Sequence, residues 1–300
     1  MIGLKELSTF GSFHPSVNFT YFVIVVAISM SSMNPWFLAG SFVSAFAYTI
    51  ILSGKSAIKF NIMFIIPIVL ISALLNMLFM HDGVTELFYM YENAVTLEAL
   101  IYGIMMGLML SGVLMWLLCY QVIMTSDKFI YLFGRILPTI ALTISMIFRY
   151  IPLIRKRFKE ITEGQRCMGR DLKEGSFVDR VHQSIKEVSI LIAWSLESSI
   201  ETSDSMEARG YGIQGRTSFH LFHFSKRDLK MMIIIVLLGG LIVAGNIADR
   251  TTIYYYPYIR YPLQDIYSYI VYGLYYILLI LPIITDIGGE VRWKQLRLKA

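Results

Sequence analysis

Long apolar runs dominate this chain. Six of them are long enough to cross the roughly 30 Å hydrocarbon core of a membrane, which takes about 20 helical residues. They cover approximately residues 17–33, 35–53, 60–80, 98–120, 231–248 and 266–285. The first two are short and only Asn34 separates them, so they are predicted to form a tight helical hairpin. The pattern predicts an all-α polytopic membrane protein with about six transmembrane helices.

A long polar segment separates the fourth run from the fifth. Residues 155–168 are predicted to form a basic helix ending near Gly169, and residues 177–208 a second helix of about 32 residues, roughly 48 Å long. Aliphatic residues recur along the second helix at three- and four-residue spacing: Val181, Ile185, Val188, Ile192, Leu196 and Ile200. This makes one apolar stripe opposite a small polar face, so the helix could lie along a membrane surface.

Residues 129–154 are apolar but interrupted by Arg135, Pro138, Arg149 and Pro152. A full span here would place residues 155–230 outside, although they hold 14 of the 26 Lys and Arg. Cytoplasmic loops normally collect positive charge. We therefore expect an interfacial or re-entrant helical segment; the alternative is that one of the short early spans is miscounted. Together with the basic tail, this pattern predicts a multi-pass protein of the cell membrane with both termini cytoplasmic.

These segments predict three regions. Residues 1–124 form a membrane domain of four spans, residues 125–230 an interfacial and cytoplasmic insert, and residues 231–300 two further spans with a basic tail. The first apolar run has no convincing cleavage site, so it is expected to stay in the membrane.

Composition supports the membrane class. The chain is 56% hydrophobic and only 16% charged, whereas about a quarter of a soluble domain is charged. The net charge of +5 is better explained by basic cytoplasmic loops than by nucleic-acid binding, so no nucleic-acid partner is expected. The two cysteines, Cys119 and Cys167, are far apart and indicate neither a disulfide framework nor a metal site.

The sequence contains no credible catalytic constellation. Gly54-Lys55-Ser56 resembles the end of a phosphate-binding loop, but Thr49 stands where that loop needs glycine. We expect a non-enzymatic chain with no cofactor and no metal. A self-contained secondary transporter is the alternative, which would favour ionisable residues inside the spans and inverted repeats. An intramembrane enzyme would need a nucleophile or acid–base groups there. The predicted spans hold almost no ionisable residues.

The end of the second long helix is the leading candidate site. Arg209 follows Ala208 and precedes Gly210, so a cation is expected at a helix C-terminus that a glycine terminates. One interpretation is a simple cap, since a cation there is stabilised by the helix dipole. The other is docking, because a guanidinium can bind a partner carboxylate bidentately while glycine permits close approach. A similar end, with Arg166, Gly169 and Arg170, lies about 40 residues earlier.

Three stretches of the chain carry a resemblance to a known family: Met206 to Gly212 (MEARGYG), Thr125 to Pro138, and Ser145 to Pro152. They resemble the transmembrane (T) component of energy-coupling factor (ECF) transporters. The first is similar to that family's second arginine motif, and the other two resemble the approach to its coupling helices. The first arginine motif departs from the family pattern. Aligning Gln165-Arg166 places Met168 where the arginine is expected, so Arg166 or Arg170 would have to substitute.

The resemblance implies a non-catalytic energy-coupling subunit. In this family two ABC ATPase subunits bind the arginine-tipped coupling helices, and a separate membrane S component captures the substrate, a vitamin or micronutrient. ATP-driven closure of the ATPases moves the helices, and the scaffold passes this motion to the S component. The resemblance therefore implies ATPase docking by Arg209, Ala208 and Gly210 at one end, and by Gly169 with Arg166 or Arg170 at the other.

Overall fold

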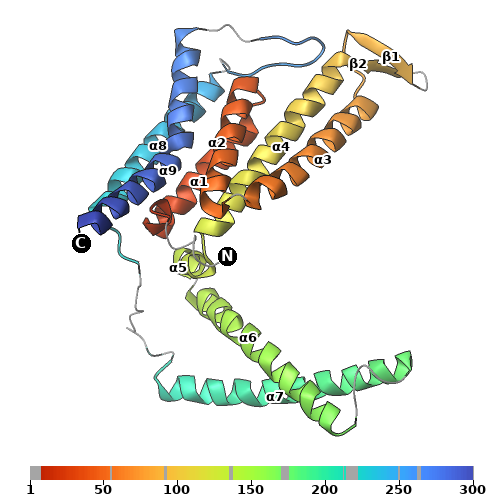
Figure 1. Ribbon diagram of the computed structural model, residues 1–300, viewed down its shortest axis with the longest axis vertical. Coiled ribbons are helices and arrows are strands. Elements are labelled where there is room, and N and C mark those ends of the chain that lie inside the picture. The colour runs from red at the N-terminus through yellow and green to blue at the C-terminus, as the bar shows by residue number, and fades with distance from the viewer. Residues whose placement is uncertain are drawn as a thin grey trace. The chain divides into compact units, whose positions relative to one another are not determined.

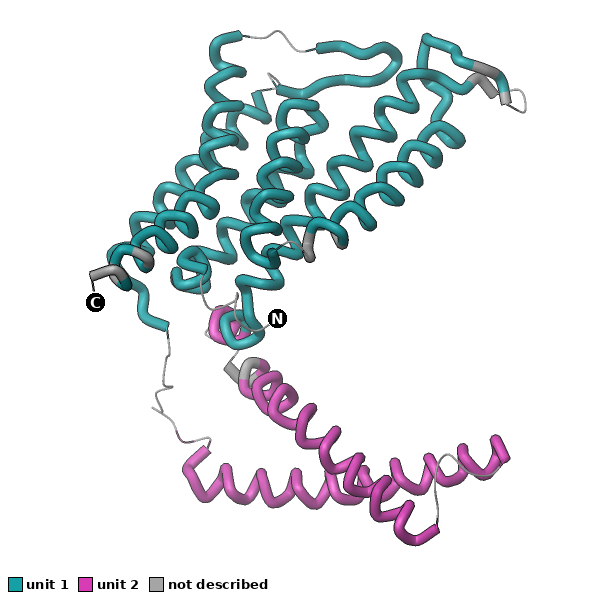
Figure 2. The backbone as a smooth tube through the Cα atoms, viewed as in Figure 1, with its two compact units in different colours: residues 1–129, 222–300 teal, residues 130–221 magenta. Residues whose placement is uncertain are grey.

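The computed structural model describes residues 8–54, 56–90, 93–134, 138–169, 176–211, 213, 222–248, 251–261 and 265–299. Helices make up most of it (Figure 1). The chain divides into two compact units (Figure 2). We call residues 1–129 with 222–300 the membrane unit, and residues 130–221 the helix-pair unit. The helix α5 (Ser126–Gly134) crosses the boundary between them.

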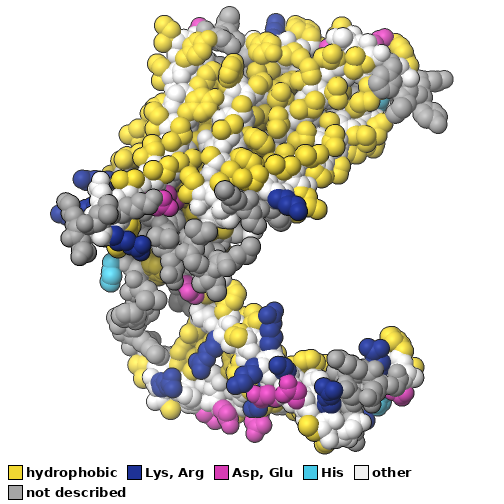
Figure 3. Space-filling view, in the orientation of Figure 1, with side chains coloured by type: hydrophobic (Ala, Val, Ile, Leu, Met, Phe, Trp, Pro, Cys, Tyr) yellow, Lys and Arg dark blue, Asp and Glu magenta, His cyan; other side chains and the backbone are white. Residues whose placement is uncertain are grey.

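A helix lies at each of the six predicted runs. These are α1 (Pro15–Ser31), α2 (Pro35–Ser53), α3 (Ser56–Phe79), α4 (Leu97–Ile123), α8 (Lys226–Ile247) and α9 (Ile266–Lys299). Five are long and apolar enough to cross a membrane, and α1 is a shorter apolar helix of 17 residues. Apolar side chains cover the face of the membrane unit seen in Figure 3. The predicted all-α polytopic membrane fold is confirmed.

Asn34 sets the turn between α1 and α2. Pro35 begins α2, where its missing N–H costs nothing, and the Asn34 side chain accepts a hydrogen bond from the Trp36 N–H at 3.0 Å. The buried Asn34 amide also donates to the Thr251 carbonyl at 2.9 Å and to the Tyr272 hydroxyl at 2.8 Å. One polar residue therefore ends the hairpin and ties it to the loop before α9 and to α9 itself.

The core of the membrane unit is aromatic. Trp116 of α4 is fully buried and its ring lies 6.1 Å from that of Tyr21. Its indole N–H donates to Ser41 Oγ at 3.0 Å. Ser41 in turn lies 3.0 Å from Ser29 Oγ, and Ser29 lies 2.9 Å from the Tyr275 hydroxyl. This chain of hydrogen bonds gives each of these four side chains a partner and joins α1, α2, α4 and α9 inside the unit.

Close backbone contact joins α3 and α4. A Cβ atom added at Gly103 would stand 2.7 Å from Ala73 Cα, and one at Gly107 would stand 2.7 Å from Val69 Cα. The Gly103-x3-Gly107 spacing thus allows the close helix approach that small residues give in lipid. The outer face of α3 is exposed along most of its length.

A short antiparallel hairpin precedes α4 and was not expected from the sequence. Strand β1 (Glu86–Met90) pairs with β2 (Asn93–Thr96). Glu98 holds the hairpin against α4, since its carboxylate accepts from the Thr85 hydroxyl at 2.7 Å and from the Thr85 N–H at 3.2 Å. The segment between α3 and α4 is therefore partly structured.

The last helix is longer than predicted. The expected span ended at residue 285, but α9 continues through the basic tail to Lys299 and includes Asp286. Asp286 is buried, and its carboxylate accepts from the Phe10 N–H at 2.6 Å, Ser8 Oγ at 3.0 Å and the Tyr48 hydroxyl at 3.2 Å. These partners lie far away in sequence, so they are invisible to a local pattern.

Charged side chains hold the N-terminal turn (η2, Phe10–Ser12) at several backbone groups. Besides Asp286, Lys128 Nζ donates to the Gly11 carbonyl at 2.6 Å and to the Ile123 carbonyl at 2.9 Å. Burial lowers the pKa of Lys128, since removal from water disfavours its charged form. Arg227 lies 4.3 Å above the Phe13 ring. The turn thus links α4, α5, α8 and α9 at one end of the membrane unit.

The helix-pair unit consists mainly of α6 (Pro138–Cys167) and α7 (Phe177–Ala208). The bounds predicted for α7 are confirmed, and a capping box of Ser176 and Asp179 begins it. The predicted start of the first helix near residue 155 is wrong, because α6 begins at Pro138. Proline suits a first helical position, and Pro152 removes only one interior hydrogen bond.

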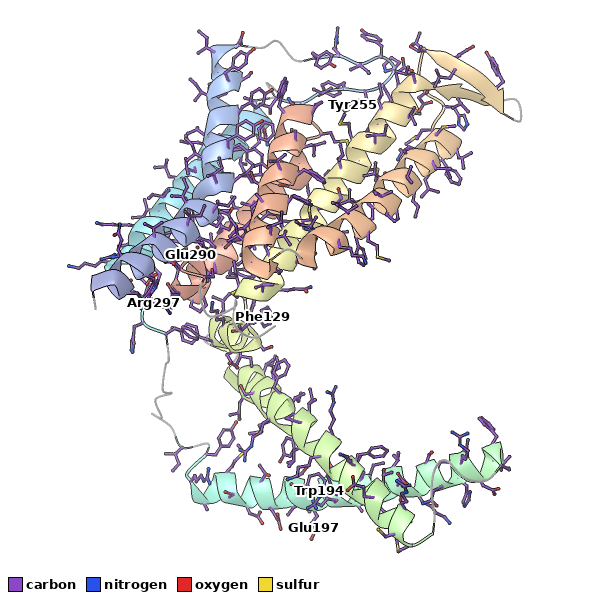
Figure 4. The ribbon with its side chains drawn as sticks, viewed as in Figure 1. Phe129, Trp194, Glu197, Tyr255, Glu290 and Arg297 are labelled. Carbon is purple, nitrogen blue, oxygen red and sulfur yellow. The ribbon has the colours of Figure 1, made fainter. Side chains whose placement is uncertain are left out.

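Polar contacts join α6 to α7 in antiparallel order. Tyr150 hydroxyl lies 2.7 Å from Thr202 Oγ1, Thr162 Oγ1 lies 2.7 Å from Glu187 Oε2, and Gln183 Nε2 donates to Gln165 Oε1 at 3.2 Å. Figure 4 shows Trp194 at the crossing, where the Arg157 guanidinium lies 4.8 Å above its ring. Glu187 is fully buried, and one of its oxygens has no partner among the described residues.

The predicted apolar stripe of α7 faces away from α6. Its six aliphatic side chains, Val181, Ile185, Val188, Ile192, Leu196 and Ile200, are between 43% and 64% exposed. The polar face carries the contacts with α6 instead. Such an uncovered stripe within the unit indicates a surface that lipid or another chain covers.

Candidate docking surface at the ends of α6 and α7

The C-terminus of α7 is a Schellman motif centred on Gly210. Gly210 has φ of +75°, which is strained for any residue with a Cβ atom. The Tyr211 N–H donates to the Met206 carbonyl at 3.0 Å, and the Gly210 N–H to the Glu207 carbonyl at 2.9 Å. Arg209 is the last residue before the left-handed glycine. The backbone therefore fixes Arg209 at the helix tip.

The side chain of Arg209 is exposed, and so is that of Ala208. No residue that the structure describes forms an ion pair or hydrogen bond with the Arg209 guanidinium. The partial negative charge of the helix end offsets part of its charge. Its five guanidinium donors are thus not engaged by the described residues and could bind a carboxylate bidentately.

The end of α6 has a related backbone but a different side chain. Gly169 also has φ of +75°, and its N–H donates to the Arg166 carbonyl at 3.0 Å. The residue before this glycine, in the position that Arg209 holds in α7, is Met168, which is 61% exposed. Arg166 lies two positions earlier and is exposed. Arg170 lies outside the described residues.

The two helix ends lie on opposite sides of the crossing (Figure 1). This follows from the antiparallel contacts, because two helices that run in opposite directions present their C-terminal ends at opposite ends of the pair. The structure therefore does not bring the predicted site residues into one cluster. It presents two separate tips, each fixed by a left-handed glycine.

Ion pairs lie on the surface of α6 in the turns before its C-terminal end. Arg157 contacts Glu160 at 2.8 Å, and Lys159 contacts Glu163 at 3.8 Å, all with substantially exposed side chains. Exposed pairs of this kind contribute roughly 0–1 kcal/mol to stability. Among the residues that the structure describes, no group of three or more His, Cys, Asp or Glu could hold a metal ion.

Comparison with known proteins identifies the family. The family model described as cobalt transport protein (CbiQ) matches residues 12–221, which is more than half of the chain. The chain belongs to this family. The match runs to Leu221 and includes both helix tips, so the candidate docking residues lie inside the matched region.

Curated relatives within this family carry a common name. The energy-coupling factor transporter transmembrane protein EcfT of Lactobacillus helveticus is 32% identical over 166 residues, 52% of this chain and 57% of that protein. EcfT 1 of Listeria monocytogenes is 35% identical over 106 residues, covering 35% and 40%. EcfT of Bacillus subtilis is 25% identical over 197 residues, covering 59% and 71%. The chain spans about half the length of the first of these. The resemblance to ECF T components is confirmed.

Proposed function

We propose that the chain is the membrane scaffold and energy-coupling subunit of an ECF-type importer. Two ABC ATPase subunits would bind the α6 and α7 tips, and a separate S component in the membrane would carry a vitamin or micronutrient. The chain itself would be non-catalytic. It would lie in the cell membrane with both termini in the cytoplasm.

The exposed Arg209 tip is the observation that carries this proposal. Its guanidinium has no partner among the described residues, and the Schellman backbone fixes the helix end from which the side chain projects. An ion pair between Arg209 and a carboxylate of a partner subunit could therefore form without any rearrangement of the helix backbone. Truncating one side of a desolvated Arg–carboxylate pair costs about 2–5 kcal/mol. Two separate tips also suit two ATPase subunits.

Arg209→Glu tests the proposal directly. The tagged chain is recovered from its native membrane, and the ATPase subunits that accompany it are quantified. We expect two ATPase subunits with the wild type and loss of at least one with Arg209→Glu, because the reversed charge would repel the partner carboxylate.

Lys186→Glu is the matched control, since it makes the same charge change on an exposed part of α7 away from the tip. It is expected to retain both subunits. Recovery of the wild type with no ATPase at all would overturn the coupling role and favour a self-contained secondary transporter. Equal loss in both variants would show general electrostatics instead of a docking residue.

A further inference from the structure

A groove runs between the N-terminal half of α6 and the C-terminal half of α7. Its volume is about 580 Å³, within the range of small-molecule sites. Leu142, Met146 and Arg149 line it from α6, and Met206 and Arg209 line it from α7. The hydrogen bond between Tyr150 and Thr202 joins the two helices within this groove.

The lining is amphiphilic. Leu142, Met146, Leu153 and Met206 are apolar, whereas Arg149 and Arg209 supply two guanidinium groups. Glu201 is the one carboxylate among the lining residues, all of which the structure describes. Neither arginine forms an ion pair with another described residue. The groove therefore carries a net positive charge beside a hydrocarbon-like surface.

The same half of α6 is apolar outside the groove. Ile140, Ile147 and Ile151 are between 41% and 51% exposed. α6 is not among the helices that are apolar enough to cross a membrane. A helix that combines exposed aliphatic side chains with arginine is typical of a membrane interface. These exposed aliphatic side chains favour lipid over a protein segment as the neighbour of the groove.

We propose that the groove binds an anionic phospholipid. Its phosphate would contact Arg149 and Arg209, and an acyl chain would lie over Leu142, Met146 and Met206. Arginine binds phosphate through two parallel hydrogen bonds, and basic pockets between helices recognise anionic headgroups. The site goes beyond the proposed function, in which Arg149 has no part. Arg209 belongs to both sites, so the lipid would contact it when no ATPase is docked.

Native mass spectrometry of the purified full-length chain tests this site. The chain, without any ATPase, is titrated with phosphatidylglycerol or with phosphatidylcholine of the same acyl chains. We expect the wild type to bind phosphatidylglycerol at least about fivefold more tightly, and Arg149→Gln to lose this preference. Millimolar inorganic phosphate is expected to leave the bound lipid in place, because free phosphate lacks the acyl chain.

Arg155→Gln is the matched control, since Arg155 is an exposed arginine of α6 that does not line the groove. It is expected to keep the preference. Met146→Trp fills the groove without changing charge and is expected to weaken both lipids. Equal effects of Arg149→Gln and Arg155→Gln would overturn the proposal, as would an unchanged preference in Arg149→Gln. Displacement of the lipid by free phosphate would do the same. Far-UV circular dichroism verifies that the variants keep their helices.

Discussion

At the scale of single residues, the two helix tips carry different side chains immediately before their glycines. Met168 in α6 stands where Arg209 stands in α7, immediately before a glycine with φ of +75°. The backbone at both tips can present a side chain in the same way. In the proposed docking, the α6 tip would therefore have to act through a neighbouring cation, or through apolar contact by Met168 itself.

Adding Met168→Arg to the double variant Arg166→Gln/Arg170→Gln tests this equivalence. The double variant is expected to lose one of two ATPase subunits, because it removes both candidate cations from the α6 tip. Met168→Arg is expected to restore that subunit, since it places a guanidinium in the position of Arg209. Subunit stoichiometry of the purified complex measures both effects. A double variant that keeps both subunits would show that Met168 docks through apolar contact.

A second prediction concerns the buried carboxylate of Asp286. Replacement by Ala leaves the Phe10 N–H and the Tyr48 hydroxyl without their acceptor. Leaving buried donors unsatisfied costs about 1–3 kcal/mol for each group. Asp286→Ala is therefore expected to lower the midpoint of thermal unfolding of the protein in detergent. Tryptophan fluorescence measured during heating gives this midpoint.

Glu290→Ala serves as its control, because Glu290 lies one turn further along α9 and is exposed (Figure 4). It is expected to leave the unfolding midpoint unchanged. A similar fall in both variants would mean that Asp286 matters only as a charge on α9.

At the scale of elements, the close packing of α3 against α4 depends on glycines of α4, which have no side chain at the contact. Gly103→Ala would place Cβ 2.7 Å from Ala73 Cα, which is backbone and cannot rotate away. Overpacking of this kind costs about 1–3 kcal/mol. We expect Gly103→Ala to lower the thermal unfolding midpoint.

Gly240→Ala is the control for Gly103→Ala, because Gly240 is also helical but an added Cβ there would lie within 4 Å of no neighbouring described element. It should be neutral or slightly stabilising, given the higher helix propensity of alanine. If Gly103→Ala were as stable as Gly240→Ala, α3 would have to be able to shift away from α4.

Local signals explain which elements could be predicted. The bounds of α7 follow from Ser176 and Asp179 at its start and from Gly210 at its end, all within one turn of the boundary. The start of α6 was missed because Pro138 and Pro152 indicated breaks, although one opens the helix and the other lies inside it. Asp286 was missed because its partners lie more than 200 residues away.

The candidate site was predictable only in part, for the same reason. A left-handed glycine after an arginine is a local signal, so the Arg209 tip was found from the sequence. The groove beside it needs Arg149 and Arg209 to come together from two helices 60 residues apart, which no spacing rule indicates.

At the scale of the whole molecule, the two cysteines report orientation. Cys119 is buried in the membrane unit, whereas Cys167 is exposed at the α6 tip. If the helix ends face the cytoplasm, a membrane-impermeant maleimide should label one thiol per chain in inside-out vesicles and none in intact cells. Glu86→Cys, on the hairpin before α4, should be labelled from outside in intact cells. Labelling of Cys167 in intact cells would reverse the proposed topology.

The outward stripe of α7 has a consequence for the life of the chain in a cell. Six aliphatic side chains in a row, uncovered within their unit, resemble the surfaces by which chaperones and proteases recognise unassembled subunits. Copies of the chain made in excess of the partner that covers the stripe would stay unassembled and be degraded. The half-life of the chain would then depend on the fraction of copies that are assembled, and the amount of the covering partner would set the abundance of the chain.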